Sequence, residues 1–467
     1  MAEPLWTSQA IERATGGRLA GPAFAVQGIS IDTRSLEPGD LFVALAGERD
    51  GHAYVAQALA RGAAGVLASR PVEGPAVMVD DTLRALERLG LAARERAVKA
   101  RRGAVTGSVG KTSVTQAVAA GLALAGSSHA SVKSYNNHIG VPLTLARMPA
   151  ATERAVFEVG MNHAGEIEPL SRMIAPHAVA VTTVGAVHTE NFPDGEAGVA
   201  RAKAEIFAGL QPGGVAVLNA DNAWFGLLKA AAEAAGADVV SFGAAAACDA
   251  QLLDFALTGD GARVSARLGG EGLAFPIRQT GFHWGMNSLA VLLMLEAMGV
   301  GRGAALQALA DFAPLEGRGA ERSVKIPGGA FVLIDDSYNA NPISVAAALR
   351  SLGARRPQGR RIVALTDMLE LGPDAARRHA EIARDVEASG VDLVFCAGPL
   401  MGALWEALPP TRRGGYAGTA VELAPEVVRA VAPGDVVLVK GSKGSEASLV
   451  AAALAGVAAA AMGGEAR

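Results

Sequence analysis

The chain has few cysteines, few aromatic residues and little excess charge, and each shortage excludes a class of protein. Its two cysteines, Cys248 and Cys396, show no paired or metal-ligand spacing, so we expect two free, buried thiols in a reducing compartment. Aromatic residues make up 4% of the 467 residues, and 42 basic against 46 acidic residues leave a net charge of -4. Nucleic-acid binding normally requires a basic surface or aromatic stacking platforms. Because the composition indicates neither, we do not expect nucleic acid as a partner.

Long apolar runs are also missing. The longest, Leu449–Met462, is mostly alanine and too short to span a bilayer, so we expect it to form a packed C-terminal helix. The first residues, Met1–Arg13, lack the basic start and apolar stretch of a signal peptide. We therefore expect a cytoplasmic protein that does not insert into membranes.

The chain does contain enough apolar material for several hydrophobic cores. Half of its residues are apolar and 19% are charged, which predicts a globular protein, and its length predicts about three domains. Short β-rich segments alternate with helical ones throughout, a pattern typical of α/β domains with parallel sheets. We predict three such domains, at residues 1–99, 100–313 and 314–467. The expected strands of the last two include Ala104–Val105, Ala155–Val159, Ala178–Thr183, Phe331–Ile334, Ile362–Leu365, Leu393–Cys396 and Val436–Val439.

A glycine-rich turn between a strand and a helix is the most informative motif. It reads Thr106-Gly107-Ser108-Val109-Gly110-Lys111-Thr112-Ser113 and precedes a helical pattern over Lys111–Leu124. In this context backbone amides and a helix N-terminus surround phosphate oxygens, while Lys111 binds the β and γ phosphates and Thr112 a magnesium ion. The strict phosphate-loop pattern requires glycine where this chain has Val105, so an ordinary glycine turn is the alternative.

Two residues that follow the loop are candidates for a cation site. Glu158 ends an apolar strand, where burial of a carboxylate is costly unless it meets a cation. The carboxyl edge of a parallel sheet is also where ligands gather. His188 follows the next strand and could reach the same edge, although magnesium prefers oxygen and an isolated histidine is more often structural. Lys203 lies in a helical segment, where a solvated surface lysine is the default interpretation.

Together these motifs resemble the Mur ligases along the whole chain. The resemblance rests on Ser30-Ile31-Asp32-Thr33-Arg34 and Pro38–Leu45 in the first domain; on the phosphate loop, Asn136-Asn137-His138 and Gly165-Glu166-Ile167 in the second; and on Asp335–Pro342, Asp367–Gly372 and Lys440-Gly441-Ser442 in the third. It implies a central parallel-sheet, phosphate-loop domain that binds ATP. An N-terminal α/β domain would bind the UDP part of the substrate, and a C-terminal Rossmann-like domain would bind a dipeptide and close over ATP.

The resemblance also implies an activity and its residues. A monomer would join D-alanyl-D-alanine to UDP-N-acetylmuramoyl-tripeptide through an acyl phosphate, with ATP and Mg²⁺, in peptidoglycan precursor synthesis. The implied substrate contacts are Ser30, Asp32, Thr33, Arg34, Asn136, Asn137 and His138. The implied nucleotide contacts are Thr106, Gly107, Ser108, Gly110, Lys111, Thr112, Ser113, His283, Asn287, Arg318, Asp336 and Asn339. Thr112, Glu158, His188 and Lys203 would bind the metal, Lys203 as a carbamate, and the catalytic set is Lys111, Glu158, His188 and Lys203.

Two alternatives stay open at this point. Another Mur-type or folylpolyglutamate-type ligase would act on a different amino acid, and the segment Tyr338–Pro342 argues against it. A nucleotide-dependent switch would use the phosphate loop without ligase chemistry and would hydrolyse ATP or GTP with no peptide acceptor. Three single positions depart from the family pattern, Thr183, Trp284 and Thr366, and the segment Ser445–Ser448 matches it only loosely.

Overall fold

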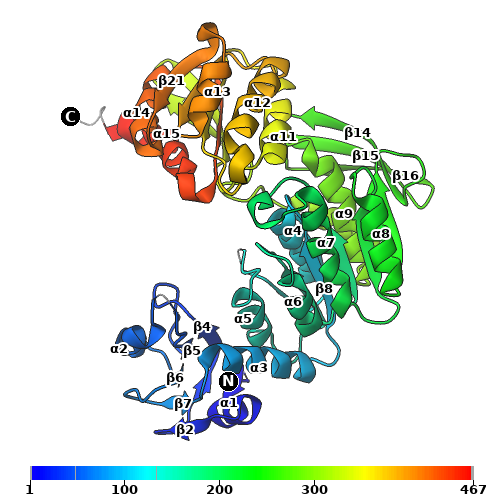
Figure 1. Ribbon diagram of the computed structural model, residues 1–467, viewed down its shortest axis with the longest axis vertical. Coiled ribbons are helices and arrows are strands. Elements are labelled where there is room, and N and C mark those ends of the chain that lie inside the picture. The colour runs from blue at the N-terminus through cyan, green and yellow to red at the C-terminus, as the bar shows by residue number, and fades with distance from the viewer. Residues whose placement is uncertain (1–2, 48, 133, 464–467) are drawn as a thin grey trace.

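The helices and strands form three α/β bodies that follow one another along the chain (Figure 1). The computed structural model describes residues 3–47, 49–132 and 134–463, with side chains up to residue 457. The N-terminal and C-terminal bodies lie at opposite ends of the long axis, with the middle body between them. This confirms the predicted three-part α/β architecture. No helix in the described part of the chain is long and apolar enough to cross a membrane.

The N-terminal body contains a five-stranded sheet in the order β2-β7-β6-β5-β4, in which β2 is antiparallel to its neighbour and the others are parallel. Its attachment to the middle body involves Trp6, whose indole donates a hydrogen bond of 2.9 Å to the carbonyl of Ala146. The guanidinium of Arg96 lies 3.7 Å above the same indole ring. The elements are β1 (Trp6–Thr7), α1 (Ser8–Thr15), β2 (Arg18–Ala20), β3 (Ala25–Val26), β4 (Gly28–Ser30), β5 (Asp40–Val43), α2 (Val55–Ala60), β6 (Gly65–Ala68), β7 (Ala76–Met78) and α3 (Thr82–Arg96).

The middle body contains a nine-stranded sheet in the order β16-β15-β14-β13-β12-β11-β8-β10-β9. Its strands are β8 (Arg101–Thr106), β9 (Ser128–Ala130), β10 (Arg154–Glu158), β11 (Ala178–Val181), β12 (Val215–Asn219), β13 (Asp238–Gly243), β14 (Ala250–Thr258), β15 (Gly261–Leu268) and β16 (Glu271–Ile277). Neighbouring strands from β9 to β14 pair in parallel, whereas β14, β15 and β16 form an antiparallel meander at one edge, in which β15 runs opposite to the other strands. Because β8 lies between β10 and β11, the loop after β8 opens at a topological switch point, where such sheets bind ligands.

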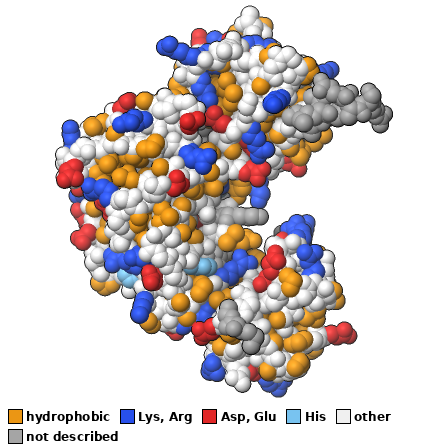
Figure 2. Space-filling model, turned by 180° about the vertical axis from the view of Figure 1, so that it is seen from behind, with side chains coloured by type: hydrophobic (Ala, Val, Ile, Leu, Met, Phe, Trp, Pro, Cys, Tyr) orange, Lys and Arg blue, Asp and Glu red, His pale blue; other side chains and the backbone are white. Residues whose placement is uncertain are grey.

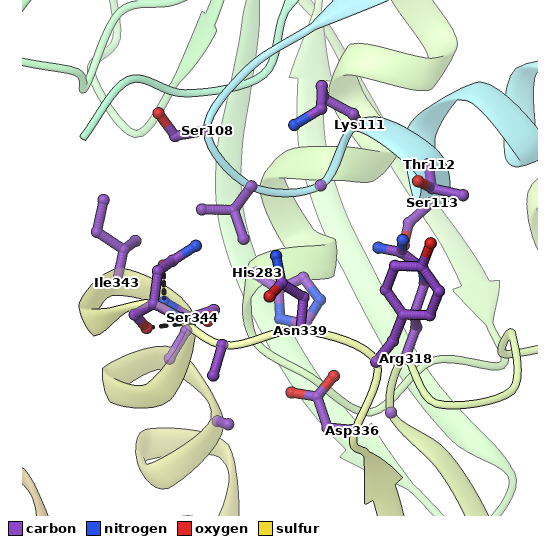
Figure 3. A pocket seen from close by; sticks show the side chains of 18 of the residues that line it. Ser108, Lys111, Thr112, Ser113, His283, Arg318, Asp336, Asn339, Ile343 and Ser344 are labelled. Carbon is purple, nitrogen blue, oxygen red and sulfur yellow. Dashed lines mark hydrogen bonds between the residues drawn. The ribbon is translucent and has the colours of Figure 1, made fainter. Parts of the chain in front are cut away.

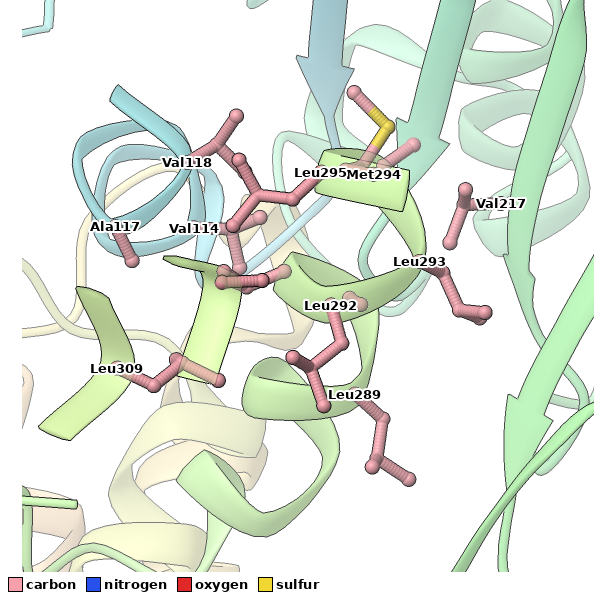
Figure 4. Close-up of a cluster of buried hydrophobic side chains, with 14 of the residues drawn as sticks. Val114, Ala117, Val118, Val217, Leu289, Leu292, Leu293, Met294, Leu295 and Leu309 are labelled. Atoms are coloured by element: carbon pink, nitrogen blue, oxygen red, sulfur yellow. The ribbon is translucent and has the colours of Figure 1, made fainter. Parts of the chain in front are cut away.

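Helices cover both faces of the middle sheet. They are α4 (Lys111–Leu124), α5 (Gly140–Ala146), α6 (Ile167–Ile174), α7 (Glu196–Ala204), α8 (Phe225–Ala234), α9 (His283–Ala297) and α10 (Arg302–Asp311). Side chains of a strand alternate between faces, so Ala104 packs into one core and Val105 into the other. In the core of Val105, Leu292 and Leu295 of α9 pack near Val118 of α4 (Figure 4). This packing fixes α4, and with it the first helical turn that carries the phosphate-loop lysine.

The C-terminal body contains a six-stranded sheet in the order β17-β18-β22-β19-β20-β21, in which only β17 is antiparallel. Its elements are β17 (Ala320–Ile326), β18 (Gly329–Asp336), α11 (Pro342–Gly353), β19 (Arg361–Thr366), α12 (Ala375–Ala388), β20 (Leu393–Ala397), α13 (Met401–Ala407), β21 (Arg413–Ala417), α14 (Ala420–Ala430), β22 (Val436–Lys440) and α15 (Ala447–Gly463). The Asn-Pro pair starts α11, because Asn341 and Ser344 form a reciprocal capping box and Pro342 occupies the first turn. The last residues of β18 and β22, Asp336 and Lys440, lie on the side of the sheet that faces the middle body.

The predicted strands and helices are confirmed at the expected positions, including α4 and the C-terminal helix α15. The last five residues of the run Leu449–Met462 lie outside the described side chains. Both cysteines are free, but Cys248 is half-buried where full burial was expected. Figure 2 shows the N-terminal body set off from the rest by a deep indentation, with acidic and basic side chains intermixed on this face.

Candidate active site

A cavity of about 730 Å³ lies where the phosphate loop faces the C-terminal body. Its lining comes from the loop and the start of α4, the ends of β10 and β11, the start of α9, and the segments that flank β17 and β18. The predicted residues that line it are Ser108, Gly110, Lys111, Thr112, Ser113, Asn136, Glu158, His188, His283, Asn287, Arg318, Asp336 and Asn339. Figure 3 shows the loop on one side and Arg318, Asp336 and Asn339 on the other, with His283 between them. The structure therefore brings together, from two bodies, residues that were predicted to contact a nucleotide.

The phosphate loop requires glycine at two positions. Gly107 has φ 150°, and a Cβ there would overlap the hydroxyl of Thr182 and lie 3.2 Å from its backbone nitrogen. Gly110 has φ 86° at the N-terminus of α4, and a Cβ there would lie 3.3 Å from the Asn287 amide. Thr182 also donates a hydrogen bond of 2.5 Å to the carbonyl of Val109. The loop is thus a tightly closed turn against β11 and α9, with the geometry of an anion cradle.

Lys111 extends back over this loop. Its Nζ donates a hydrogen bond of 2.8 Å to the carbonyl of Gly107. Burial lowers the pKa of Lys111, Glu158 opposes that shift, and Arg318 adds to it. The attraction of a bound phosphate would therefore offset the cost of burying this ammonium group and its repulsion by Arg318.

Glu158 presents a buried carboxylate with one unused oxygen. The residue ends β10 and its exposed fraction is 1%. Asn136 donates a hydrogen bond of 2.7 Å to Oε1, whereas Oε2 is buried and has no hydrogen-bond partner. A carboxylate in this state is costly unless a cation or donor completes it, so the observed environment fits a hard cation such as Mg²⁺.

Lys203 is 2% exposed, so the interpretation as a solvated surface lysine is wrong. Burial and the nearby Lys111 lower its pKa well below the usual range. Among the ion pairs of the described residues, none includes Lys203. A buried ammonium without an anionic partner is strongly disfavoured. The environment of Lys203 therefore favours a neutral amine or an anionic derivative of it.

His188 connects two bodies. It lies beyond the end of β11 with φ 57°, and its Nδ1 is 2.6 Å from Oε2 of Glu370 in the C-terminal body. Although this distance is short, Nδ1 has no hydrogen-bond partner, so the Glu370 oxygen lies off the direction of an N–H bond at Nδ1. The contact with His188 lowers the pKa of Glu370. In the described residues no three His, Cys, Asp or Glu side chains gather into a metal site, so a cation here would also need other oxygens, such as those of Thr112 and phosphate.

On the side of the cavity that belongs to the C-terminal body, contacts between charged and polar groups hold the side chains in place. The Arg318 guanidinium lies 4.0 Å above the Tyr338 ring, and the Tyr338 hydroxyl hydrogen-bonds to Ser134 of the middle body. Lys440, which is 2% exposed, donates to Asp336 Oδ2 at 2.7 Å. No local sequence pattern indicates the contact of Ser134 with Tyr338, because the two residues are 204 positions apart.

Several predicted residues lie outside this cavity. Thr106, Gly107 and Lys203 are not among its lining residues, and Asn137 and His138 border a second cavity of about 300 Å³. The other four predicted substrate residues lie at the end of β4 and directly after it in the N-terminal body, where they form hydrogen bonds or ion pairs within that body. Ser30 Oγ donates to the Asp32 carbonyl at 3.0 Å, Thr33 donates to Gln57 at 3.1 Å, and Arg34 pairs with Asp32 at 2.7 Å.

The three departures from the family pattern are accommodated by local contacts. Trp284 is 2% exposed and packs against Phe312, with ring centroids 5.7 Å apart. The Thr183 hydroxyl accepts a hydrogen bond of 3.0 Å from Asn222. The Thr366 hydroxyl lies 2.6 Å from that of Ser445, within hydrogen-bonding distance. Each replacement therefore has a packing or hydrogen-bonding partner.

Comparisons with known proteins give similarity along the whole chain. Residues 25–102 match the Mur ligase family catalytic domain, residues 105–295 the Mur ligase middle domain, and residues 322–443 the Mur ligase glutamate ligase domain. The UDP-N-acetylmuramoyl-tripeptide–D-alanyl-D-alanine ligase of Escherichia coli is 36% identical over 82% of this chain and 83% of its own. The ligase of the same name from Rickettsia prowazekii is 30% identical over 94% and 97%. A crystal structure of MurF from Acinetobacter baumannii superposes with a TM-score of 0.84 at 28% identity, and covers 97% of this chain and 99% of its own.

Proposed function

Because the chain belongs to the Mur ligase family of ATP-dependent amide ligases, we propose that it joins D-alanyl-D-alanine to UDP-N-acetylmuramoyl-tripeptide in peptidoglycan precursor synthesis. The observation that carries this proposal is the cavity in which a phosphate loop, an incompletely satisfied carboxylate and cationic groups of the C-terminal body meet. Relatives over 30% identical bear the name of this one ligase. We further propose that it acts as a monomer in the cytoplasm.

Each of the three bodies would bind a different ligand of the reaction. Residues 1–99 would bind the UDP end through the segment Ser30–Arg34, residues 100–313 would bind ATP, and residues 314–467 would bind the dipeptide and cover the nucleotide. Asn137 and His138 would contact the substrate on its way from the N-terminal body, since they border the smaller cavity beside α6. These limits and roles are part of the proposal.

A carboxylate does not react with an amine in water, because it has no good leaving group. ATP supplies one: an oxygen of the tripeptide carboxylate bonds to the γ phosphorus, ADP leaves, and an acyl phosphate results. The dipeptide nitrogen then attacks the acyl carbon, phosphate departs, and the nitrogen loses a proton to give the amide. Catalysis of phosphoryl transfer depends on positioning and charge stabilisation more than on covalent chemistry of the enzyme.

The residues of the cavity have roles that follow from their placement. Lys111 would leave the Gly107 carbonyl for a phosphate oxygen, and the loop amides would hold the others. Thr112 and Glu158 would hold magnesium, which neutralises the charge of the phosphate groups. Arg318 would approach the nucleotide from the C-terminal body, where Tyr338 holds its guanidinium. Contact between the two bodies would also exclude water that hydrolyses the acyl phosphate.

Lys203 would bear a carbamate. As an ammonium it is buried next to Lys111 with no anionic partner among the residues that the structure describes, whereas a carbamate would present a negative charge to Lys111 and to magnesium. The same conversion would add oxygen ligands to a site that has few carboxylates of its own.

The proposal is tested by phosphate release from ATP in the presence of each substrate alone and of both together. We expect release to require UDP-N-acetylmuramoyl-tripeptide and D-alanyl-D-alanine together, because the tripeptide accepts the phosphoryl group and the dipeptide completes turnover. The Lys111→Ala variant is the control for contaminating activity and should be inactive with its fold intact. Full turnover with either substrate alone, or with neither, would show a nucleotide hydrolase or switch and would contradict the proposal.

A further inference from the structure

The contact of His188 with Glu370 joins two residues that both have an unusual backbone. His188 has φ 57° and Glu370 has φ 63°, whereas only four non-glycine residues with positive φ occur in the described chain. Such conformations cost about 1–3 kcal/mol each and persist where the surrounding structure requires them. Here they direct two side chains from different bodies toward each other, to an Nδ1–Oε2 distance of 2.6 Å. Both residues line the large cavity.

The surrounding segments touch as well. In the loop that carries His188, a Cβ on Gly185 would overlap the end of the Ile343 side chain at the start of α11. A Cβ on Gly372 would lie 3.2 Å from the Cβ of Glu190. The His188–Glu370 pair is therefore at the centre of a contact between the loop after β11 and the C-terminal body, and not an isolated meeting of long side chains.

The loop that carries Glu370 is firmly held within its own body. The Met368 amide donates a hydrogen bond of 2.9 Å to Nε2 of His379, a residue with no exposed surface. The Leu369 amide donates one of 2.9 Å to the hydroxyl of Ser442. Movement of the C-terminal body therefore carries Glu370 with it, so its carboxylate reaches His188 only when the two bodies are in contact.

We propose that Glu370 is a positioning residue, which holds Nδ1 of His188 so that Nε2 is directed to the reacting phosphate and its cation when the C-terminal body docks. A carboxylate on one imidazole nitrogen fixes the proton there and leaves the other nitrogen as the free ligand or acceptor. The oxygen is still off the N–H direction, and such contacts often align only in the substrate complex. The assignment rests on the proposed ligase function for its role, but the contact itself can be measured without turnover.

The first measurement concerns the contact in full-length, metal-free protein labelled with ¹⁵N-histidine, with and without ADP. The His188 signal is identified by its loss in His188→Asn. In the wild-type protein we expect the proton of the His188 ring on Nδ1, and in Glu370→Ala we expect it on Nε2. In Glu370→Gln a part of the molecules should keep the proton on Nδ1, because the amide oxygen still accepts a hydrogen bond. Glu387→Gln removes a carboxylate from the exposed face of α12 in the same body and should leave the spectrum unchanged.

The second measurement is steady-state turnover of the same variants. We expect Glu370→Ala to lower kcat by about 10–100-fold, the usual effect of losing the partner of a ligand histidine, with little change in the KM of the tripeptide. Glu370→Gln should recover part of this loss, and Glu387→Gln should behave as wild type. An unprotonated Nδ1 in wild-type protein under both conditions, or wild-type kcat in Glu370→Ala, would overturn the proposal. If the wild-type protein makes no amide product, the proposed function fails, whereas the spectra still decide whether the contact exists.

Discussion

Replacing Gly107 with alanine changes the phosphate loop where its backbone has least freedom. The residue has φ 150°, and an added Cβ would overlap the Thr182 hydroxyl and lie 3.2 Å from the Thr182 backbone nitrogen. The obstacle, Thr182, directly follows the last residue of β11 and is 4% exposed, so it cannot move aside cheaply. The loop can avoid the overlap only by leaving the conformation that presents its amides to phosphate.

The expected magnitude has two parts. A side chain in a backbone region reserved for glycine costs about 1–3 kcal/mol. Overpacking against a tightly packed neighbour costs about 1–3 kcal/mol more. At about 1.4 kcal/mol per factor of ten, even the lower sum of about 2 kcal/mol weakens ATP binding about 30-fold.

Isothermal titration with ATP, together with thermal unfolding, measures the effect. The matched control is Gly236→Ala in the same body: Gly236 also has positive φ, at 77°, but a Cβ there would have no atom within 4 Å. We expect the control to lose about 1 kcal/mol of stability and to bind ATP as wild type. Wild-type ATP affinity in Gly107→Ala would refute the assignment of this turn as the phosphate site.

Two further predictions concern buried titratable residues. Lys203→Ala should be folded but inactive, and small carboxylic acids should partly restore turnover by supplying the missing anion. If the variant turns over like the wild-type protein, the proposal that Lys203 carries a carbamate is wrong. For His379, burial lowers the pKa of the imidazole below its usual 6.5. As the pH falls through 6.5, the unfolded chain takes up a proton more readily than the folded chain does, so His379 should make the wild-type protein less stable at pH 5.5 than at pH 8. His379→Gln should be less stable than the wild-type protein at pH 8, and urea unfolding should show a smaller difference in unfolding free energy between the two proteins at pH 5.5. An equal difference at both pH values would contradict the pKa shift.

Much of the fold could be predicted from local patterns. The strand at Ala104–Val105, the glycine turn and the helix Lys111–Leu124 follow each other in a few residues, and the structure has β8, the loop and α4 at these positions. The Asn-Pro pair likewise marks the start of α11. The antiparallel strands β15 and β16 were not predicted, since the alternation of strands and helices favoured parallel pairing throughout.

The candidate site was predictable only in part. The strand end at Glu158 indicated a cation site, and its buried, unpartnered oxygen agrees with that prediction. The burial of Lys203 could not be read from its helical segment, because it depends on how α7 packs between distant parts of the chain. The contact of His188 with Glu370 depends on the docking of two bodies, for which sequence spacing carries no signal.

The most direct test of the ligase account is the mass of the product made from UDP-N-acetylmuramoyl-tripeptide, ATP and D-alanyl-D-alanine. Amide formation predicts a product equal to the sum of the two substrates less one water, formed in step with ADP and phosphate. Release of ADP and phosphate while the tripeptide keeps its original mass would contradict the central claim.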